Sequence, residues 1–195
     1  MRQVSHFKLT RLITRWFRCL IISALLFGSA IQFSYAYSDD TTTDDKSVFI
    51  SEYDASLWLL KMSQRLEKYV KEDHLRLEIL RHVYLEAEKN QLNPNFVLSV
   101  MHVESFFDPN AISSAGAQGL MQVMPFWKKE IGTREDNLKD IQTNIRYGCA
   151  ILKTYLLQEE GNSVRALARY NGSIGQTWYA ARVFRAWKDY WALNG

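Results

Sequence analysis

From residue 56 onward, apolar side chains recur every three or four positions, the period of an α-helix that is buried on one side. The first such stripe is formed by Leu57, Leu60, Met62, Leu66 and Val70. A second helix is predicted after Asp73, and a third after Asn93-Pro94, a capping residue followed by a proline suited to the first turn. We expect this third helix to end near Ser105.

The second half of the chain continues in the same way. A loop rich in Gly, Ser and Ala, residues 112–125, follows the third helix. Asp140 is predicted to cap a helix running to about Glu159, Ser163 to begin another that ends at Asn171-Gly172, and Thr177 to begin the last. The final stripe, expected in the core, comprises Val183, Phe184, Trp187, Tyr190 and Trp191. Because no sustained period-two alternation occurs, the pattern predicts an all-α single globular domain over residues 56–195.

The N-terminal segment has a different pattern. Basic residues run to Arg18, an apolar stretch extends from Cys19 to Ile31, and the small residues of Ser34-Tyr35-Ala36 suit a signal peptidase. We therefore interpret residues 1–36 as a cleaved signal peptide and the protein as exported, periplasmic or associated with the cell envelope. The alternative is an uncleaved membrane anchor, since the uncharged stretch approaches the length that spans a bilayer.

Composition and charge refine this prediction in three ways. Residues 1–36 hold five basic and no acidic side chains, so the remainder has 19 basic against 21 acidic residues and is not a basic nucleic-acid binder. Residues 37–55 are polar and acidic, which predicts a disordered spacer. Only Cys19 and Cys149 are present, and Cys149 lies on an apolar helical run, where we expect a buried, inert thiol.

Glu104 is the most informative polar residue. Val97, Met101 and Glu104 have i, i+4, i+7 spacing, so the carboxylate extends the buried stripe at the end of the third helix. Burial and the negative end of the helix dipole both raise a carboxyl pKa, and a Glu protonated near neutral pH can act as a general acid. Taken alone, this spacing favours a Glu that frays into solvent or pairs with an Arg over a catalytic one.

The loop after Glu104 favours a binding site. Its Gly, Ser and Ala residues have little bulk, so backbone can approach a ligand closely. Gln122 supplies an amide donor and acceptor suited to sugar hydroxyl or N-acetyl groups. Met121 and Met124 would pack against a ring face or fill the core.

Three segments together resemble one known family. The stretch ESFFDPNAISSAGAQGLMQVMP, residues 104–125, resembles the central motif of the soluble lytic transglycosylase (SLT) catalytic domain, which is related to goose-type lysozymes. NIRYGCAIL, residues 144–152, and ALARYNGSIG, residues 166–175, resemble two later motifs of that family in the same order. The resemblance covers about residues 90–175 and implies a lysozyme-like fold.

The resemblance also implies site residues. Glu104 stands at the position of the catalytic acid/base, and Ser113, Gln122 and Met124 stand at substrate-contacting positions. Tyr170 matches a tyrosine whose hydroxyl points toward the catalytic carboxylate, and Asn171 accompanies it. After this pair the family usually has Ala-Gly-Pro-Gly, whereas this chain has residues 172–175, Gly-Ser-Ile-Gly.

The implied reaction is cleavage of the β-1,4 bond between N-acetylmuramic acid and N-acetylglucosamine in peptidoglycan glycan strands, with closure of a 1,6-anhydro ring. A single Glu performs it, without a cofactor or a metal; cell-envelope assembly partners stay unknown. Most glycosidases need a second carboxylate, and here only Asp108 is nearby, where it reads as a turn residue.

Three alternatives remain open from the sequence. A goose-type muramidase would use the same Glu104 and add water. A zinc enzyme is suggested only by His102 and Glu104, with His74 and His82 too scattered to predict a site. A non-catalytic peptidoglycan-binding or assembly module would be expected to lose Glu104, which is present.

Overall fold

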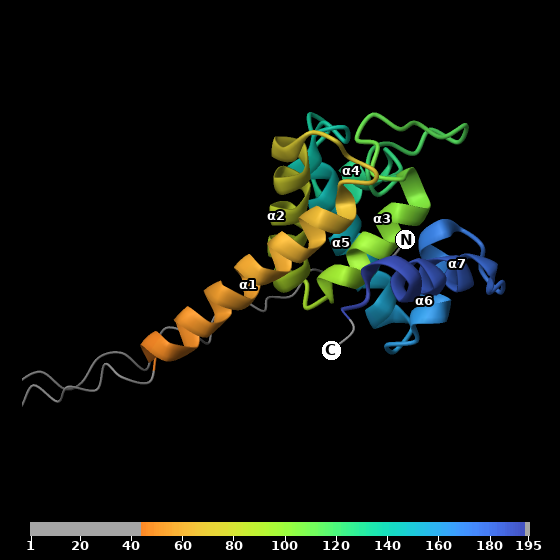
Figure 1. Cartoon of the computed structure of the whole chain (residues 1–195). Helices are drawn as coiled ribbons and strands as arrows, with labels where there is room; N and C mark the ends of the chain where they lie inside the picture. Colours follow the sequence, from red (N-terminus) through yellow and green to blue (C-terminus); the bar gives the residue numbers. More distant parts are fainter. Residues whose placement is uncertain (1–43, 194–195) are drawn as a thin grey trace, which may run out of the picture. The chain divides into compact units, whose positions relative to one another are not determined.

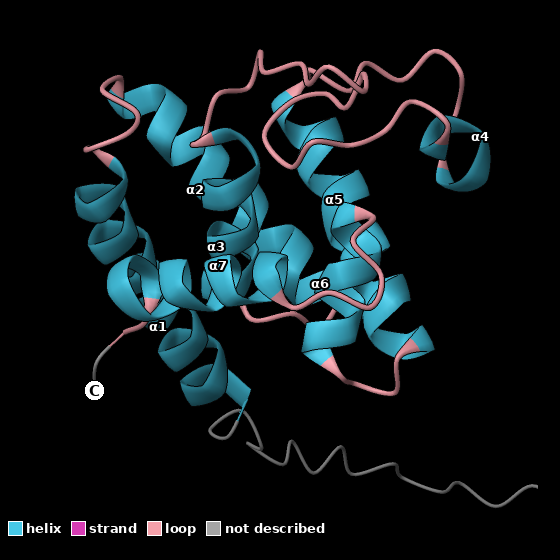
Figure 2. Cartoon of the chain, turned by 90° about the vertical axis from the view of Figure 1, so that its right-hand side faces the viewer, coloured by secondary structure: helices cyan, strands magenta, loops and turns pink. Residues whose placement is uncertain are grey.

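The computed structural model describes residues 44–193, and regular structure within that range is helical (Figures 1 and 2). The elements are α1 (Asp44–Leu66), α2 (Asp73–Lys89), α3 (Pro94–Ser105), α4 (Trp127–Ile131), α5 (Ile141–Gln158), α6 (Ser163–Asn171), α7 (Trp178–Ala186) and the π-helical turn η1 (Trp187–Trp191). Across the described residues, strand-like pairing is limited to isolated bridges of Gln118 with Ile112 and Val123. The all-α prediction is confirmed. The predicted signal peptide, residues 1–36, lies outside the described residues.

The start of α1 differs from the prediction. Residues 37–55 were expected to form a disordered spacer, yet α1 begins at Asp44, so residues 44–55 are helical, while 37–43 lie outside the described range. The physical reason is cooperativity: nucleating a helix is costly, but extending one adds residues singly at little cost. The segment anchored in the core by Trp58 and Met62 lets the helix extend backward through a polar stretch.

The buried side of each helix is narrower than the apolar pattern suggested. In α1 the core residues are Trp58, Met62 and Leu66, at i, i+4, i+8 spacing, whereas Leu60 faces solvent. In α2, Leu77 and Leu85 are likewise exposed. Apolar residues off the stripe stay at the surface because each helix has a neighbour on only part of its circumference.

The third helix, α3, lies among the others (Figure 1). It packs against α2, α7 and η1; α5 packs against α2 and α6, α6 against α7, and α1 against α2 and η1. Eight consecutive residues of α3, Asn95 to His102, are buried, so the helix is packed on all sides until two residues before Glu104. Among the described helices, none is both long and apolar enough to cross a membrane.

Local capping chemistry sets several helix ends as predicted. The Asn93 side chain accepts a hydrogen bond from the Asn95 amide at 2.8 Å, and Asp140 accepts one from Thr143 at 2.8 Å. Gly172 ends α6 in a left-handed conformation, with φ of 78°. These contacts join residues two or three apart, which is why the sequence alone predicted them.

The last aromatic stripe was predicted only in part. Trp191 is fully buried and its indole N–H donates to Nδ1 of His102 at 3.0 Å. Tyr190, expected in the core, is 42% exposed. The wider turn of η1 changes the helical spacing over its five residues, and the stripe drawn with an α-helical period therefore misplaces Tyr190. The short helix α4 was also not predicted.

Candidate active site

Glu104 lies in the last turn of α3 and meets a side chain from α7. The hydroxyl of Tyr179 donates a hydrogen bond to Oε1 of Glu104. Tyr179 is almost fully buried, and a buried phenol needs a hydrogen-bond partner. The two side chains therefore stabilise each other, and the carboxylate is held in one orientation.

The surroundings of Glu104 shift the pKa of its carboxyl group toward neutrality. Burial raises the pKa of Glu104 to about 7, against a usual value of 4.5. The Tyr179 hydrogen bond and the positive charge of Arg182 both stabilise the carboxylate form and lower this pKa, but by less than burial raises it. The balance leaves both protonation states accessible, which proton transfer in both directions requires.

The chain after Glu104 turns sharply and is fastened to the following loop. Ser105 Oγ donates to the carbonyl of Leu120 at 2.7 Å and accepts from the amide of Phe107 at 3.1 Å. Phe106 and Phe107 both have left-handed backbones, with φ of 50° and 67°. Such conformations are strained for bulky residues and persist where the surroundings enforce them. Burial of Phe107 supplies that constraint and directs the exposed Phe106 outward.

The Gly/Ser/Ala-rich loop is braced by one buried side chain of α5. Asn144 Oδ1 accepts from the amide of Met121 at 2.8 Å, and its Nδ2 donates to the carbonyls of Gln118 at 2.8 Å and Leu138 at 2.6 Å. Gly119 has a φ of 74°, and a Cβ there would lie 2.6 Å from the Leu138 carbonyl oxygen. The small residue at 119 therefore makes room for the Asn144 brace.

Tyr170 approaches the same loop from α6. Its hydroxyl donates to the carbonyl of Met121 at 2.9 Å, whereas the hydroxyl of Tyr179 donates to Glu104. Burial and then the negative charge of Glu104 raise the pKa of the Tyr170 hydroxyl. Glu104, Tyr170, Tyr179 and the loop at Met121 thus converge from four parts of the chain.

The other predicted site residues occupy the loop and the end of α6. Gln122 has a left-handed backbone (φ 48°), and its side-chain nitrogen donates to the carbonyls of Gly119 at 3.0 Å and Ala111 at 3.3 Å. Its amide oxygen accepts no hydrogen bond from the described residues. Ser113 Oγ accepts from the Ala117 amide at 3.0 Å and closes a turn. Met124 is partly buried and Asn171 is exposed. Among the described residues, no hydrogen bond joins Ser113 or Asn171 to Glu104, Tyr170 or Tyr179.

Tyr179 is the site residue that the sequence reasoning missed. It stands in the second position of α7, 75 residues from Glu104, in no motif that had been singled out. The available signal was that Tyr179 and Val183 share one apolar face, which marks Tyr179 as buried and so in need of a partner. Which partner it finds depends on how α7 packs against α3.

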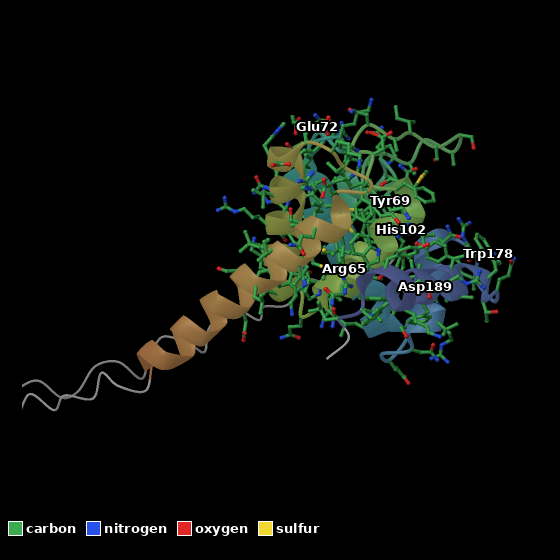
Figure 3. All side chains as sticks on the ribbon, viewed as in Figure 1. Arg65, Tyr69, Glu72, His102, Trp178 and Asp189 are labelled. Carbon is green, nitrogen blue, oxygen red and sulfur yellow. The ribbon has the colours of Figure 1, made fainter. Side chains whose placement is uncertain are left out.

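Two other reactive side chains have ordinary structural roles. Cys149 is fully buried, as expected, and burial raises the pKa of its thiol. His102 points its Nδ1 at the Trp191 indole and packs against Tyr69 with ring centroids 4.8 Å apart (Figure 3). Within residues 44–193 no three His, Cys, Asp or Glu side chains come together in a group that could hold a metal ion.

The matches to known proteins include the following three. The chain is 36% identical over 92 residues to a protein named transglycosylase from Enterobacteria phage PRD1, covering 47% of this chain and 34% of that protein. It thus spans about a third of that relative's length. A structure of an inactive mutant of the lytic transglycosylase Slt from Pseudomonas aeruginosa is 33% identical, with a TM-score of 0.44, over 49% of this chain and 17% of the other.

The third match is to a family. The sequence profile of the Transglycosylase SLT domain matches residues 83–191, more than half of the chain. This range begins within α2 and ends with η1, so it includes Glu104, the braced loop, Tyr170 and Tyr179. The chain belongs to the Transglycosylase SLT domain family.

Proposed function

We propose that the protein is a peptidoglycan lytic transglycosylase in which Glu104 is the catalytic acid and base. The observation that carries this proposal is the pKa of Glu104, raised by burial to about 7 while Tyr179 holds the carboxyl group in place. A group with that pKa is protonated in a large share of molecules at neutral pH and can give up and regain a proton.

The reaction balances with one carboxyl group. Glu104 donates its proton to the glycosidic oxygen as the bond from that oxygen to C1 of N-acetylmuramic acid breaks. The carboxylate then accepts the proton of the C6 hydroxyl as O6 forms a bond to C1, which closes the 1,6-anhydro ring. No water is consumed, and Glu104 regains the proton it began with.

The surroundings of Glu104 favour this reaction over hydrolysis. Within the described residues, Tyr179 and Arg182 stabilise its charged form, and no other acidic residue is among the groups that shift its pKa. Asp108, the nearest acid along the chain, is exposed and accepts a hydrogen bond from the Asn110 amide at 2.8 Å, which stabilises a turn. A second acid is what hydrolytic glycosidases use for this purpose.

The remaining predicted residues are proposed to hold the sugar. The unused amide oxygen of Gln122 would accept from a hydroxyl or N-acetyl N–H group, and Met124 would pack against a ring face. Ser113 and Asn171 are also proposed to contact the glycan. Holding the C6 hydroxyl beside C1 gives it an effective concentration with which solvent water does not compete. Export through the predicted signal peptide would bring the protein to this substrate in the cell envelope.

The products distinguish the candidate reactions. Purified cell-wall sacculi are digested with the protein, and the released muropeptides are analysed by chromatography and mass spectrometry. We expect ends in 1,6-anhydro-N-acetylmuramic acid, lighter by one water than hydrolysed ends and resistant to borohydride reduction. Reducible muramic acid ends as the main product would identify a muramidase instead. Sedimentation of the protein with sacculi that release no fragments would identify a binding module.

A further inference from the structure

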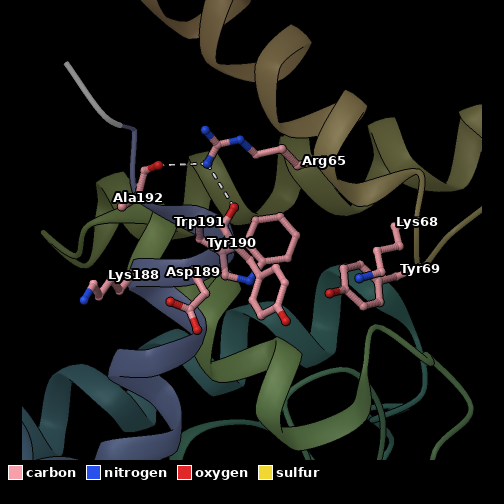
Figure 4. A pocket seen from close by; sticks show the side chains of 8 residues that line it. All are labelled: Arg65, Lys68, Tyr69, Lys188, Asp189, Tyr190, Trp191 and Ala192. Atoms are coloured by element: carbon pink, nitrogen blue, oxygen red, sulfur yellow. Dashed lines mark hydrogen bonds between the residues drawn. The ribbon is translucent and has the colours of Figure 1, made fainter.

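One cavity adjoins the end of α3 that bears Glu104, and a second cavity lies next to the first. The first, of about 200 Å³, is lined by Val103 and Phe106, which flank Glu104 in the chain, and by Arg182 and Arg185 of α7. The second, of about 330 Å³, lies between the end of α1 and η1 (Figure 4). Asp189 and Tyr190 line both cavities, so the two are adjacent, and together they are called the channel below.

Cations dominate this channel. Its walls carry Arg182, Arg185, Arg65, Lys68 and Lys188 against the single acid Asp189. In the described part of the chain, none of these side chains belongs to an ion pair. The domain beyond residue 36 has slightly more acidic than basic residues, so this concentration of positive charge is local.

The channel is built by elements that hold its charges in place. Arg65 Nη1 donates to the carbonyls of Tyr190 at 2.9 Å and Ala192 at 2.8 Å, which joins α1 to the end of η1 (Figure 4). The Lys68 ammonium lies 5.4 Å from the centre of the Tyr190 ring. Hydrogen bonds to carbonyls and contact with an aromatic face leave the positive charges unneutralised.

The electrostatic effect of these cations extends from one cavity to the other. Burial and then the charge of Lys68 lower the pKa of His102, whose ring lines the first cavity while Lys68 lines the second. On the side of Glu104, the charge of Arg182 reaches the carboxylate. Positive charges therefore lower the pKa of groups at both ends of the channel, His102 near Lys68 and Glu104 near Arg182.

We propose that this channel binds the carboxylate groups of the peptide stem of peptidoglycan. The inference rests on the proposed function: the stem is attached to the muramic acid that would lie at Glu104, and Val103 and Phe106 begin the channel directly beside that residue. The stem supplies most of the negative charge of such a strand. Arginine forks and lysines recognise carboxylates well, so the channel selects strands that bear stems over bare glycan.

The test compares two substrates and three variants. Rates are measured on sacculi with intact stems and on the same material after an amidase has removed the stems. The ratio of the two rates should fall about fivefold or more in the double variant Arg185→Glu, Lys188→Glu. It should rise in Asp189→Asn, which removes the only acid of the channel. The matched control Arg81→Glu, on an exposed position of α2, should leave the rates and their ratio unchanged. An equal ratio in the wild type and the double variant would overturn the proposal.

A binding assay separates this inference from the proposed reaction. Sedimentation of the Glu104→Gln protein with intact and with stem-free sacculi measures recognition without cleavage, whatever the reaction proves to be. If the double variant binds intact sacculi more weakly than the parent protein but binds stem-free sacculi equally well, the channel is supported as a site for the stem. Vesicles containing phosphatidylglycerol form the other arm. If the double variant loses vesicle binding but sediments normally with intact sacculi, the channel is a site for lipid phosphate and the proposal is wrong.

Discussion

The hydroxyl of Tyr179 donates its hydrogen bond to Oε1 of Glu104 across 75 residues of chain. Burial of Glu104 favours its neutral form, and the phenol favours its charged form. The pKa of about 7 is the result of this opposition, so either partner can be changed to test it.

Replacing Glu104 by Gln should abolish the proton transfers while keeping the fold. The amide is nearly isosteric, and burial at this position favours an uncharged group. We expect the release of muropeptides to fall by at least ~10²-fold, the low end for general acid–base catalysis. Unchanged turnover at an equal melting temperature would contradict the assignment of Glu104.

The same variant should remove a pH dependence of stability. Glu104 has a pKa of about 7 when folded and about 4.5 when exposed, so the folded state binds more protons between these values. Its contribution is fully present below pH 4.5 and is lost as pH rises through 7. Glu104→Gln should therefore be more stable than the wild type at pH 8, by at most about 3 kcal/mol, and similar at pH 4.5. Urea unfolding at both pH values measures this, and a stability difference independent of pH would contradict it.

Removing the Tyr179 hydroxyl should move the pH profile. In Tyr179→Phe the carboxylate loses a hydrogen bond that stabilises it, so the pKa of Glu104 rises and the decline of activity above neutral pH moves to higher pH. Tyr84→Phe, in α2 and away from Glu104, is the matched control and should leave the profile in place. A Tyr179→Phe profile that moves to lower pH, or does not move, would show that the hydrogen bond does not set this pKa.

Asn144→Ala should destabilise the domain and impair the loop beside Glu104. The variant leaves the buried amide of Met121 and the carbonyls of Gln118 and Leu138 without this partner. We expect the free energy of unfolding to fall by about 2–4 kcal/mol, measured by urea denaturation. Asn137→Ala, an exposed change in the preceding loop, should cost less than about 1 kcal/mol. Equal losses of unfolding free energy in the two variants would show that the Asn144 hydrogen bonds stabilise the domain no more than an exposed loop side chain does.

Local chemistry allowed the sequence to determine much of the fold. Caps such as Asn93 and Asp140 act over two or three residues, and the helical period places Glu104 on the buried side of α3 without reference to any other helix. The family motifs likewise mark Glu104 and the loop that follows it. The apolar period also indicated where the core lies, although its first stripe included Leu60, which is exposed.

Only the tertiary structure decided which side chains meet. Tyr179 donates its hydrogen bond to Glu104 while Tyr170 donates to the carbonyl of Met121, Asn144 fills the space beside Gly119, and the π-helical turn exposes Tyr190 in the cation-rich channel. Each of these outcomes joins elements far apart in the chain. Their partners depend on how α3, α5, α7 and η1 pack, and the period of any one helix contains no information about the helix that it will contact.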